Sequence, residues 1–160
     1  YSDDRGRTWK LGGLIRPKVN ECQVAELFDG RGTLLMNMRS NHGRNLRAHA
    51  TSTDGGASWS AVSHVDALVE PVCQASLVRH EPNLLLFSNP AAKTRINLTV
   101  RASADEGRTW REVAVLHPGP SAYSCLVSLG ATTAGCLYEN GEKNRYERIT
   151  FARFSLSETR

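Results

Sequence analysis

The chain has 160 residues and a formal net charge of +4, and 40% of its residues are hydrophobic. Its lysines and arginines are scattered and form no basic stripe interleaved with aromatic residues, which argues against nucleic-acid binding. No apolar run approaches membrane-spanning length. The four cysteines lie far apart without Cys-x-x-Cys spacing, which excludes the common zinc sites. Disulfides and reduced core thiols both remain open.

Three copies of one short pattern recur at residues 2–9, 52–59 and 103–110. They share the template Ser-x-Asp-x-Gly-x-Thr/Ser-Trp. The only three tryptophans of the chain, Trp9, Trp59 and Trp110, close the copies and are separated by 50 and 51 residues. A fixed period of this length indicates repeated supersecondary units, each burying one face against its neighbour.

Each copy predicts a tight hairpin turn. An Asp folds its carboxylate back onto backbone N–H groups, and Gly supplies a positive φ. The Trp is expected to lie over the hairpin and join the core between units. These folding roles account for the repeated residues better than a catalytic role does. We assign them to Asp3, Gly6 and Trp9, to Asp54, Gly56 and Trp59, and to Asp105, Gly107 and Trp110.

The intervals between the copies predict short strands, with a turn at residues 29–32. In chain order, the expected strands cover residues 24–28, 33–39, 47–52, 75–79, 83–88, 98–103, 124–128, 135–139 and 147–154. Short strands with no long helical period indicate an all-β fold. Four strands per unit of roughly 40–50 residues are typical of a β-propeller blade. A Greek-key sandwich is the alternative, but it would not repeat the same turn in register.

A propeller ring normally closes with about four to eight blades, and this chain offers about three units and a trailing piece. We therefore expect it to be the C-terminal part of a longer protein. For that full-length protein, a secreted, extracellular or lysosomal location is expected.

Inner strands of a propeller aim side chains at one mouth of the central channel, so polar residues within them are candidates for function. Five stand out: Glu21, Arg39, Arg95, Tyr123 and Glu139. The residues alone leave alternatives open. Glu26 is as plausible a charge as Glu21, and Tyr123 could be a packed core tyrosine. Arg44 and Arg47, which we interpret as exposed loop charges, compete with Arg39.

The chain resembles the exo-α-sialidases, or neuraminidases. The three repeats match the Asp-boxes of that family. Residues 20–27 and 37–40 look like its catalytic-glutamate strand pair, and residues 86–99 and 119–124 are similar to its lysosomal-type branch. The resemblance implies a six-bladed β-propeller with the Asp-boxes on the rim away from the active site. The chain would hold the end of blade 3 (1–15), blade 4 (16–65), blade 5 (66–117) and blade 6 (118–160).

The resemblance also implies a chemistry. Tyr123 would be the nucleophile and Glu21 would accept its phenolic proton. Arg39 and Arg95 would grip the substrate carboxylate, because guanidinium pairs bidentately with carboxylates. Glu139 would orient a further arginine. The substrates would be sialylated glycoconjugates, hydrolysed with retention and without metal or organic cofactor.

Two parts of the family's site have no counterpart in the chain: an arginine in an Arg-Ile-Pro context and the acid/base Asp. Both belong to the N-terminal half of the family's propeller, so the remaining blades would be needed and the isolated chain should be inactive. Two other functions stay open, a non-catalytic Asp-box propeller that binds glycans or proteins and a glycosidase that cleaves neutral sugars through two carboxylates.

Overall fold

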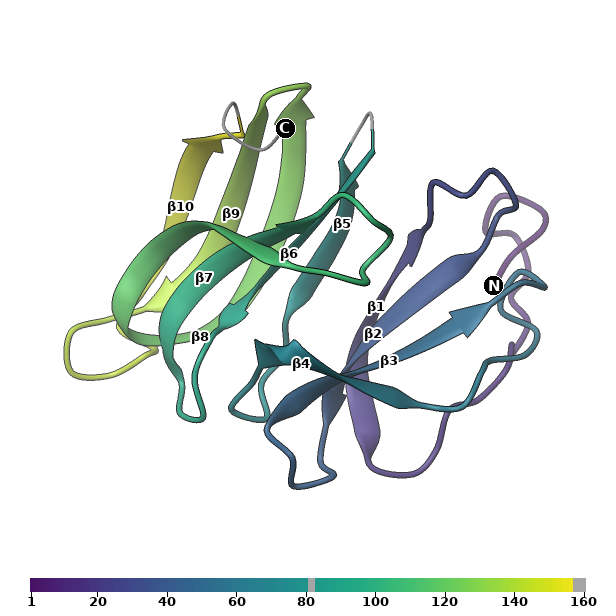
Figure 1. The fold of residues 1–160 in the computed structure, drawn as a ribbon, viewed down its shortest axis with the longest axis horizontal. Coiled ribbons are helices and arrows are strands. Elements are labelled where there is room, and N and C mark those ends of the chain that lie inside the picture. The colour runs from purple at the N-terminus through teal and green to yellow at the C-terminus, as the bar shows by residue number, and fades with distance from the viewer. Residues whose placement is uncertain (81–82, 157–160) are drawn as a thin grey trace.

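A computed structural model of the chain describes residues 1–80 and 83–156. Within these residues, ten antiparallel strands form two sheets (Figure 1). The first sheet has the order β1-β2-β3-β4, with β1 (Val19–Glu26), β2 (Leu34–Ser40), β3 (Leu46–Ser52) and β4 (Ser63–Val69). The second has the order β10-β9-β8-β7-β6-β5, with β5 (Ser76–His80), β6 (Leu84–Pro90), β7 (Ile96–Ser103), β8 (Arg111–Gly130), β9 (Thr133–Asn140) and β10 (Arg148–Ser155).

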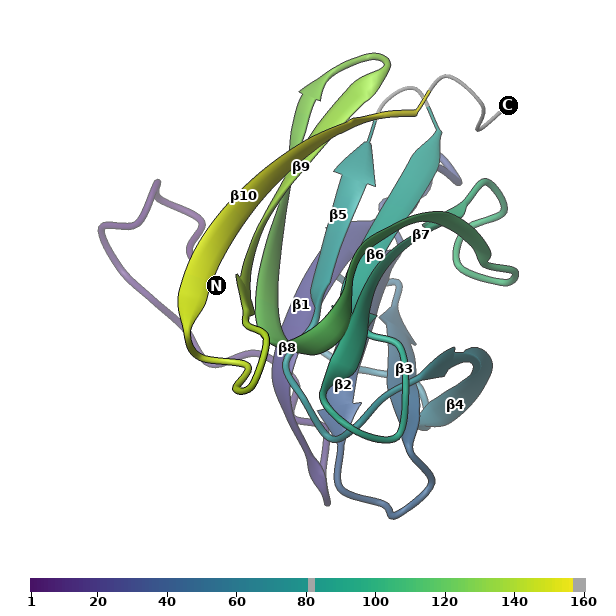
Figure 2. The same cartoon turned by 90° about the vertical axis from the view of Figure 1, so that its left-hand side faces the viewer.

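The second sheet contains two units joined by β8, which curves strongly (Figure 2). Up to Pro120 the strand pairs with β7, and from Ser121 onward it pairs with β9. This change of partner lies close to the expected unit boundary at residue 117, whereas the boundary expected at residue 65 falls inside β4. The assignment of the units to particular blades stays a prediction, and its last residues, 157–160, lie outside the described part of the chain.

The core lies between successive units, as the repeat predicts. One apolar cluster joins the first sheet to β5 and β6 and includes Leu35, Leu77, Leu85 and Phe87. A second lies on the other face of β6 and β7 and includes Leu86, with residues of β8 and β9. Leu85, Leu86 and Phe87 are all fully buried. Because successive strand residues point to opposite faces, this run is buried only if both faces of its sheet are covered.

The sequence did not predict β4 or the first half of β8. β4 has a mixed pattern in which Ser63, Asp66 and Ala67 are exposed, so it carries no regular alternation. The first half of β8 contains Pro118-Gly119-Pro120, which is typical of a turn. The strand nevertheless continues, because its pairing with β7 shifts register at three places and so accommodates the irregular backbone.

The repeated turns have one shared geometry. In the second copy, Asp54 accepts hydrogen bonds from the backbone N–H and the hydroxyl of Ser58, at 2.9 and 2.5 Å, and from the hydroxyl of Ser52 at 2.7 Å. Gly56 has a φ of 88°, and Gly6 and Gly107 each have a φ of 83°. The predicted hairpin turn and the need for glycine are therefore confirmed.

Two details of the first copy were wrong. The carboxylate that accepts the bonds from Thr8 and Ser2 belongs to Asp4, because the template places Asp third in the box. Asp3 instead pairs with Lys10 on the surface at 3.0 Å. Trp9 is 75% exposed and does not join a core. No strand is described before Val19, so the first copy has no sheet to pack against, whereas Trp59 and Trp110 contact apolar clusters.

The cysteines are free thiols, with Cys73 and Cys136 buried and Cys22 and Cys125 exposed. Among residues 1–80 and 83–156, no helix is long and apolar enough to cross a membrane.

Candidate active site

Three residues recur at intervals of 51: Glu21 near the start of β1, Val72 just before β5, and Tyr123 in β8, shortly after that strand changes its partner from β7 to β9. Glu21 lies at a β-bulge, where the pairing of β1 with β2 shifts between Asn20 and Cys22. Its φ of 37° is unusual for a non-glycine residue, and Val72 shares this feature with a φ of 53°. Bulges re-aim side chains at functional sites. The bulge turns Glu21 toward Tyr123, although the two residues are far apart in sequence.

Glu21 is the centre of the polar cluster at this end of the strands. The hydroxyl of Tyr123 donates to its Oε1 at 2.6 Å, and Nη1 of Arg39 donates to its Oε2 at 2.6 Å. The Glu21 side chain is 33% exposed and that of Arg39 is 20% exposed. The cluster is therefore partly shielded from water but still open to a ligand.

The three side chains shift one another's ionisation. Partial burial raises the pKa of Glu21, but the hydrogen bonds from Tyr123 and Arg39 and the charges of Arg39 and Arg95 outweigh this effect, so the pKa lies below its ordinary value. The hydrogen bond to Glu21, then burial and the Glu21 charge, raise the pKa of Tyr123. The same carboxylate raises the pKa of Arg39. The resting site thus holds a neutral phenol between a carboxylate and cations.

Arg95 provides the second cation. Its guanidinium carbon lies 5.7 Å from the centre of the Tyr123 ring. The group is held by two acceptors, the backbone oxygen of Val72 at 3.3 Å from Nη2 and the hydroxyl of Tyr146 at 2.9 Å from Nη1. Tyr146 was not singled out from the sequence, since it lies in the loop between β9 and β10 and no pattern connects it with Arg95.

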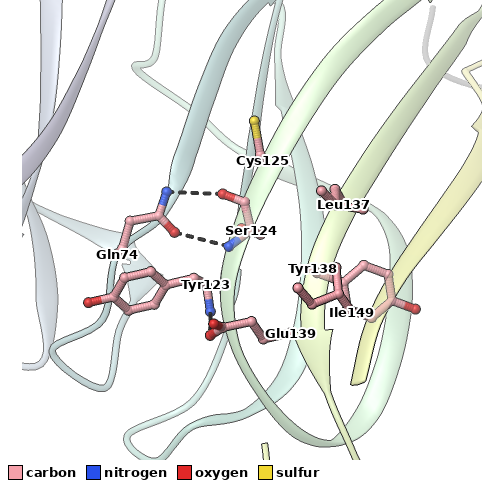
Figure 3. Close-up of a pocket in the computed structure, with 8 residues that line it drawn as sticks. All are labelled: Gln74, Tyr123, Ser124, Cys125, Leu137, Tyr138, Glu139 and Ile149. Carbon is pink, nitrogen blue, oxygen red and sulfur yellow. Dashed lines mark hydrogen bonds between the residues drawn. The ribbon is translucent and has the colours of Figure 1, made fainter. Parts of the chain in front are cut away.

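Glu139 contacts the same residue from β9. Its Oε2 accepts the backbone N–H of Tyr123 at 3.0 Å (Figure 3). A hollow of about 290 Å³ opens beside these two residues, with Leu137, Tyr138 and Ile149 among its lining residues. All five residues expected at the site are therefore brought together.

Gln74 supports Tyr123 from the neighbouring unit. Its side-chain amide donates to the backbone oxygen of Ser124 and accepts from the backbone N–H of Ser124, both at 3.0 Å (Figure 3). Gln23, one period earlier, accepts the backbone N–H of Leu77 at 2.6 Å. Each glutamine thus binds the backbone of a strand in the next unit: Gln23 that of β5, and Gln74 that of β8. Their spacing of 51 residues was the sequence signal that could have identified them.

Arg47 is not an exposed loop charge, and that interpretation was wrong. It lies in β3 with 1% of its side chain exposed and pairs with the equally buried Glu70 at 2.7 Å. Its Nη1 also donates to the backbone oxygen of Cys73, and Glu70 accepts the backbone N–H of Ser40. The pair therefore fixes the backbone next to Arg39 and next to Val72. Arg44 is exposed, and Glu26 lies 3.7 Å from Arg79, away from the cluster.

The described residues contain no group of three or more His, Cys, Asp or Glu side chains that could hold a metal ion.

Residues 1–136 match the BNR repeat-like domain family. The chain belongs to this family. It is 40% identical over 162 residues to a sialidase of Micromonospora viridifaciens and 32% identical over 201 residues to sialidase-3 of Mus musculus. These alignments include 95% and 97% of the chain, but 25% and 48% of the two relatives.

Solved structures agree with the sequence relatives. The Hadza microbial sialidase Hz136 superposes with a TM-score of 0.83 at 40% identity, over 98% of this chain and 31% of that one. The intramolecular trans-sialidase of Ruminococcus gnavus, solved in complex with oseltamivir carboxylate, superposes with a TM-score of 0.78 at 25% identity, over 99% and 37%. The fold is that of the sialidase β-propellers, and the chain spans a quarter to a half of these relatives' length.

Proposed function

We propose that the protein containing this chain is a retaining exo-α-sialidase that releases terminal sialic acid from glycoconjugates. The observation that carries the proposal is the 2.6 Å hydrogen bond from the Tyr123 hydroxyl to Glu21, flanked by Arg39 and Arg95. The sialidase relatives support the same activity. Glu21 and Glu139, the two carboxylates of the cluster, are both bound to other groups within the described chain: Glu21 to Tyr123 and Arg39, and Glu139 to the backbone of Tyr123. This arrangement disfavours a glycosidase that uses a pair of carboxylates as acid and nucleophile.

A neutral phenol suits this substrate. Sialic acid carries a carboxylate on its anomeric carbon, so an Asp or Glu nucleophile would meet like-charge repulsion there. The Tyr123 oxygen attacks the anomeric carbon and its proton passes to Glu21, while the bond from that carbon to the leaving oxygen breaks. Water then attacks the same carbon and gives a proton to a base in the rest of the propeller, while the bond to Tyr123 breaks and Glu21 returns its proton to the phenolic oxygen. The two inversions give net retention. The raised pKa of Tyr123 and the lowered pKa of Glu21 make complete proton transfer before attack unfavourable, so attack and transfer occur together.

Arg39 links the binding of substrate to the basicity of Glu21. In the free protein its hydrogen bond and its charge help to lower the pKa of Glu21. When a substrate carboxylate pairs with Arg39, part of that charge is neutralised, and Glu21 becomes a stronger base. Arg95, beside the ring of Tyr123, holds the same carboxylate, and Glu139 fixes the backbone from which Tyr123 projects.

The leaving oxygen needs a proton, and the proposal assigns its donor and a further carboxylate-binding arginine to the rest of the propeller. The chain by itself is therefore expected to be inactive.

The test measures release of an aryl leaving group from an α-sialoside by the full-length protein. Tyr123→Phe and Glu21→Gln should each lower kcat by about 10²–10⁴-fold, the range for loss of a positioned nucleophile or base. Glu26→Gln makes the same change further along β1, and Tyr138→Phe removes a hydroxyl in the adjacent strand; both should keep most activity. Saturable binding of the sialoside without hydrolysis by the unaltered protein would favour the non-catalytic Asp-box propeller instead.

A further inference from the structure

A second hollow of about 290 Å³ has Arg95, but not Tyr123, among its lining residues. It is formed where the start of β7 meets the loop between β9 and β10. Three of its lining residues are cations, Arg95, Lys143 and Arg145, and among the described lining residues none carries a carboxylate. Such a site favours an anion.

The loop that supplies two of these cations is fixed in place by Glu147. Its carboxylate accepts the backbone N–H groups of Glu142, Lys143 and Asn144, at 3.0, 3.0 and 2.7 Å. These hydrogen bonds lower the pKa of Glu147, so its carboxylate stays ionised across the neutral range. The side chain of Asn144 accepts the backbone N–H of Tyr146 at 3.0 Å.

The acidic residues of the loop already have partners. Glu147 is bound to the loop backbone, and Glu142 lies 3.5 Å from Arg148. Within the described chain, Lys143 has no ion-pair partner, and Arg145 contacts only the ring of Tyr146, with 5.0 Å between its guanidinium carbon and the ring centre. Both cations are exposed and face a hollow that no acidic side chain lines.

Arg95 connects the hollow with the proposed active site. Its guanidinium lies beside the Tyr123 ring, and its Nη1 donates to the hydroxyl of Tyr146, which lines the hollow. Under the proposed function, Arg95 holds the carboxylate on the anomeric carbon. The leaving sugar is attached to that same carbon, so a charged group on the leaving sugar lies within reach of cations that neighbour Arg95.

We propose that this hollow, lined by Arg95, Lys143, Arg145 and Tyr146, binds a second anionic group on the substrate, carried by the sugar next to the terminal sialic acid. The inference rests on the proposed function and names its substrate class: glycans with two negative groups on neighbouring sugars. A carboxylate of a second sialic acid and a sulfate ester share this chemistry. Lys143 and Arg145 are the specificity residues.

The experiment compares three substrates of the full-length protein: sialyllactose with one charge, disialyllactose, and a sialyllactose sulfated on galactose. KM is measured for the unaltered protein, for Lys143→Ala/Arg145→Ala, and for the control Arg7→Ala/Arg31→Ala, which removes two exposed charges outside the hollow. For each substrate, the KM of a variant is divided by the KM of the unaltered protein, so that differences in glycosidic linkage between the substrates do not affect the comparison.

We expect Lys143→Ala/Arg145→Ala to raise KM for a doubly charged substrate about fivefold relative to KM for sialyllactose, because each exposed charge pair contributes a few-fold. The control should leave the ratio unchanged, and high salt should remove the difference between the proteins. An effect with disialyllactose alone identifies a carboxylate as the ligand, and one with the sulfated substrate alone identifies a sulfate.

Equal changes in KM for all three substrates, or no change, would overturn the second anion site and leave the proposed function intact. Failure of the unaltered protein to hydrolyse sialyllactose would instead overturn the proposed function. In that case, calorimetry with the same proteins measures the binding of disialyllactose and of sialyllactose. Equal affinities of the unaltered protein for the two glycans would overturn the anion site. A preference for disialyllactose that is lost only in Lys143→Ala/Arg145→Ala would support it.

Discussion

Two sets of positions repeat at intervals of 50 to 51 residues but differ in which residues they keep: the three Asp-box turns, at the predicted rim of the propeller, and residues 21, 72 and 123, at its predicted mouth. The three rim turns keep the same Ser, Asp, Gly and Trp and the same hydrogen bonds. The mouth position that recurs every 51 residues is occupied in turn by Glu21, Val72 and Tyr123. Residues that do one folding task in every unit are repeated, whereas residues that build a single site differ from unit to unit.

The electrostatics of the two regions differ in the same way. At the rim, hydrogen bonds from the Ser58 side chain and backbone lower the pKa of Asp54 to about 2, and those from Thr8 do the same for Asp4. These carboxylates are satisfied within their own turns. At the mouth, Glu21 and Arg39 come from β1 and β2 of the first sheet and Tyr123 from β8 of the second, and the three residues shift one another's pKa. The carboxylates of the turns therefore stabilise the turns, whereas the coupled ionisation of Glu21, Arg39 and Tyr123 is what the proposed proton transfer requires.

The largest effect should follow from Arg39→Ala at the mouth. Loss of a charged partner for the substrate carboxylate is expected to lower kcat/KM about 10³-fold. The acid limb of the pH profile should also move to higher pH, because Glu21 must be ionised to accept the proton and Arg39 lowers its pKa. Arg44→Ala removes an exposed charge from the loop that follows β2 and serves as the control. A normal pH profile in Arg39→Ala would contradict the coupling to Glu21.

The next effect concerns the buried pair behind the mouth. Glu70→Gln keeps the size of the side chain but leaves the buried Arg47 cation without its counter-charge. We expect a loss of about 3 kcal/mol in the free energy of unfolding, measured by denaturant titration. Asp3→Asn breaks an exposed pair in which the two side chains are 59% and 67% exposed and should change stability little. Equal losses in both variants would show that burial does not decide the strength of these pairs.

A smaller effect is expected at the rim. Asp105→Ala removes the acceptor for the hydroxyls of Ser103 and Thr109, at 2.8 and 2.6 Å. The expected loss of stability is about 1–2 kcal/mol, with kcat/KM nearly unchanged when it is measured well below the melting temperature. A large loss of kcat/KM in a folded Asp105→Ala protein would contradict the separation of rim and mouth.

The smallest effect is the pH dependence of stability that comes from the same turn. Burial opposes the shift, but the hydrogen bonds from Thr109 and Ser103 lower the pKa of Asp105 to about 2, from 3.8. A depressed pKa in the folded state contributes stability above pH 3.8, and this contribution is lost as the pH falls through about 2. Asp105→Asn should therefore flatten the fall of stability between pH 4 and pH 2. An unchanged slope would show that Asp105 is not shifted.

Much of the fold could be predicted from the sequence because local patterns determine it. Apolar runs mark strands such as β2, which follows the turn at residues 29–32, and β6, which begins with four apolar residues. The Asp29-Gly30-Arg31-Gly32 turn forms as expected, with positive φ at Gly30 and Gly32. β4 and the first half of β8 escaped prediction because neither carries a regular pattern and both are held by pairing with a neighbour.

The site was predictable only where residues match the family pattern. The five expected side chains meet, yet residue types alone could not separate Glu21 from Glu26, because the bulge at Asn20–Cys22 that turns Glu21 inward is a tertiary feature. Arg47 was misread because its partner Glu70 lies 23 residues away. Tyr146 was missed because its loop meets Arg95 only in the folded chain.

The central claim is that the hydroxyl at position 123 attacks the anomeric carbon. A fluorinated sialosyl fluoride, whose fluorine beside the anomeric carbon slows hydrolysis of a covalent intermediate, should inactivate the full-length protein. Mass spectrometry should then find one sialyl adduct on Tyr123, and no adduct on the Tyr123→Phe protein. An adduct on Glu21, or on any other residue of an enzyme that still turns over sialosides, would contradict the account.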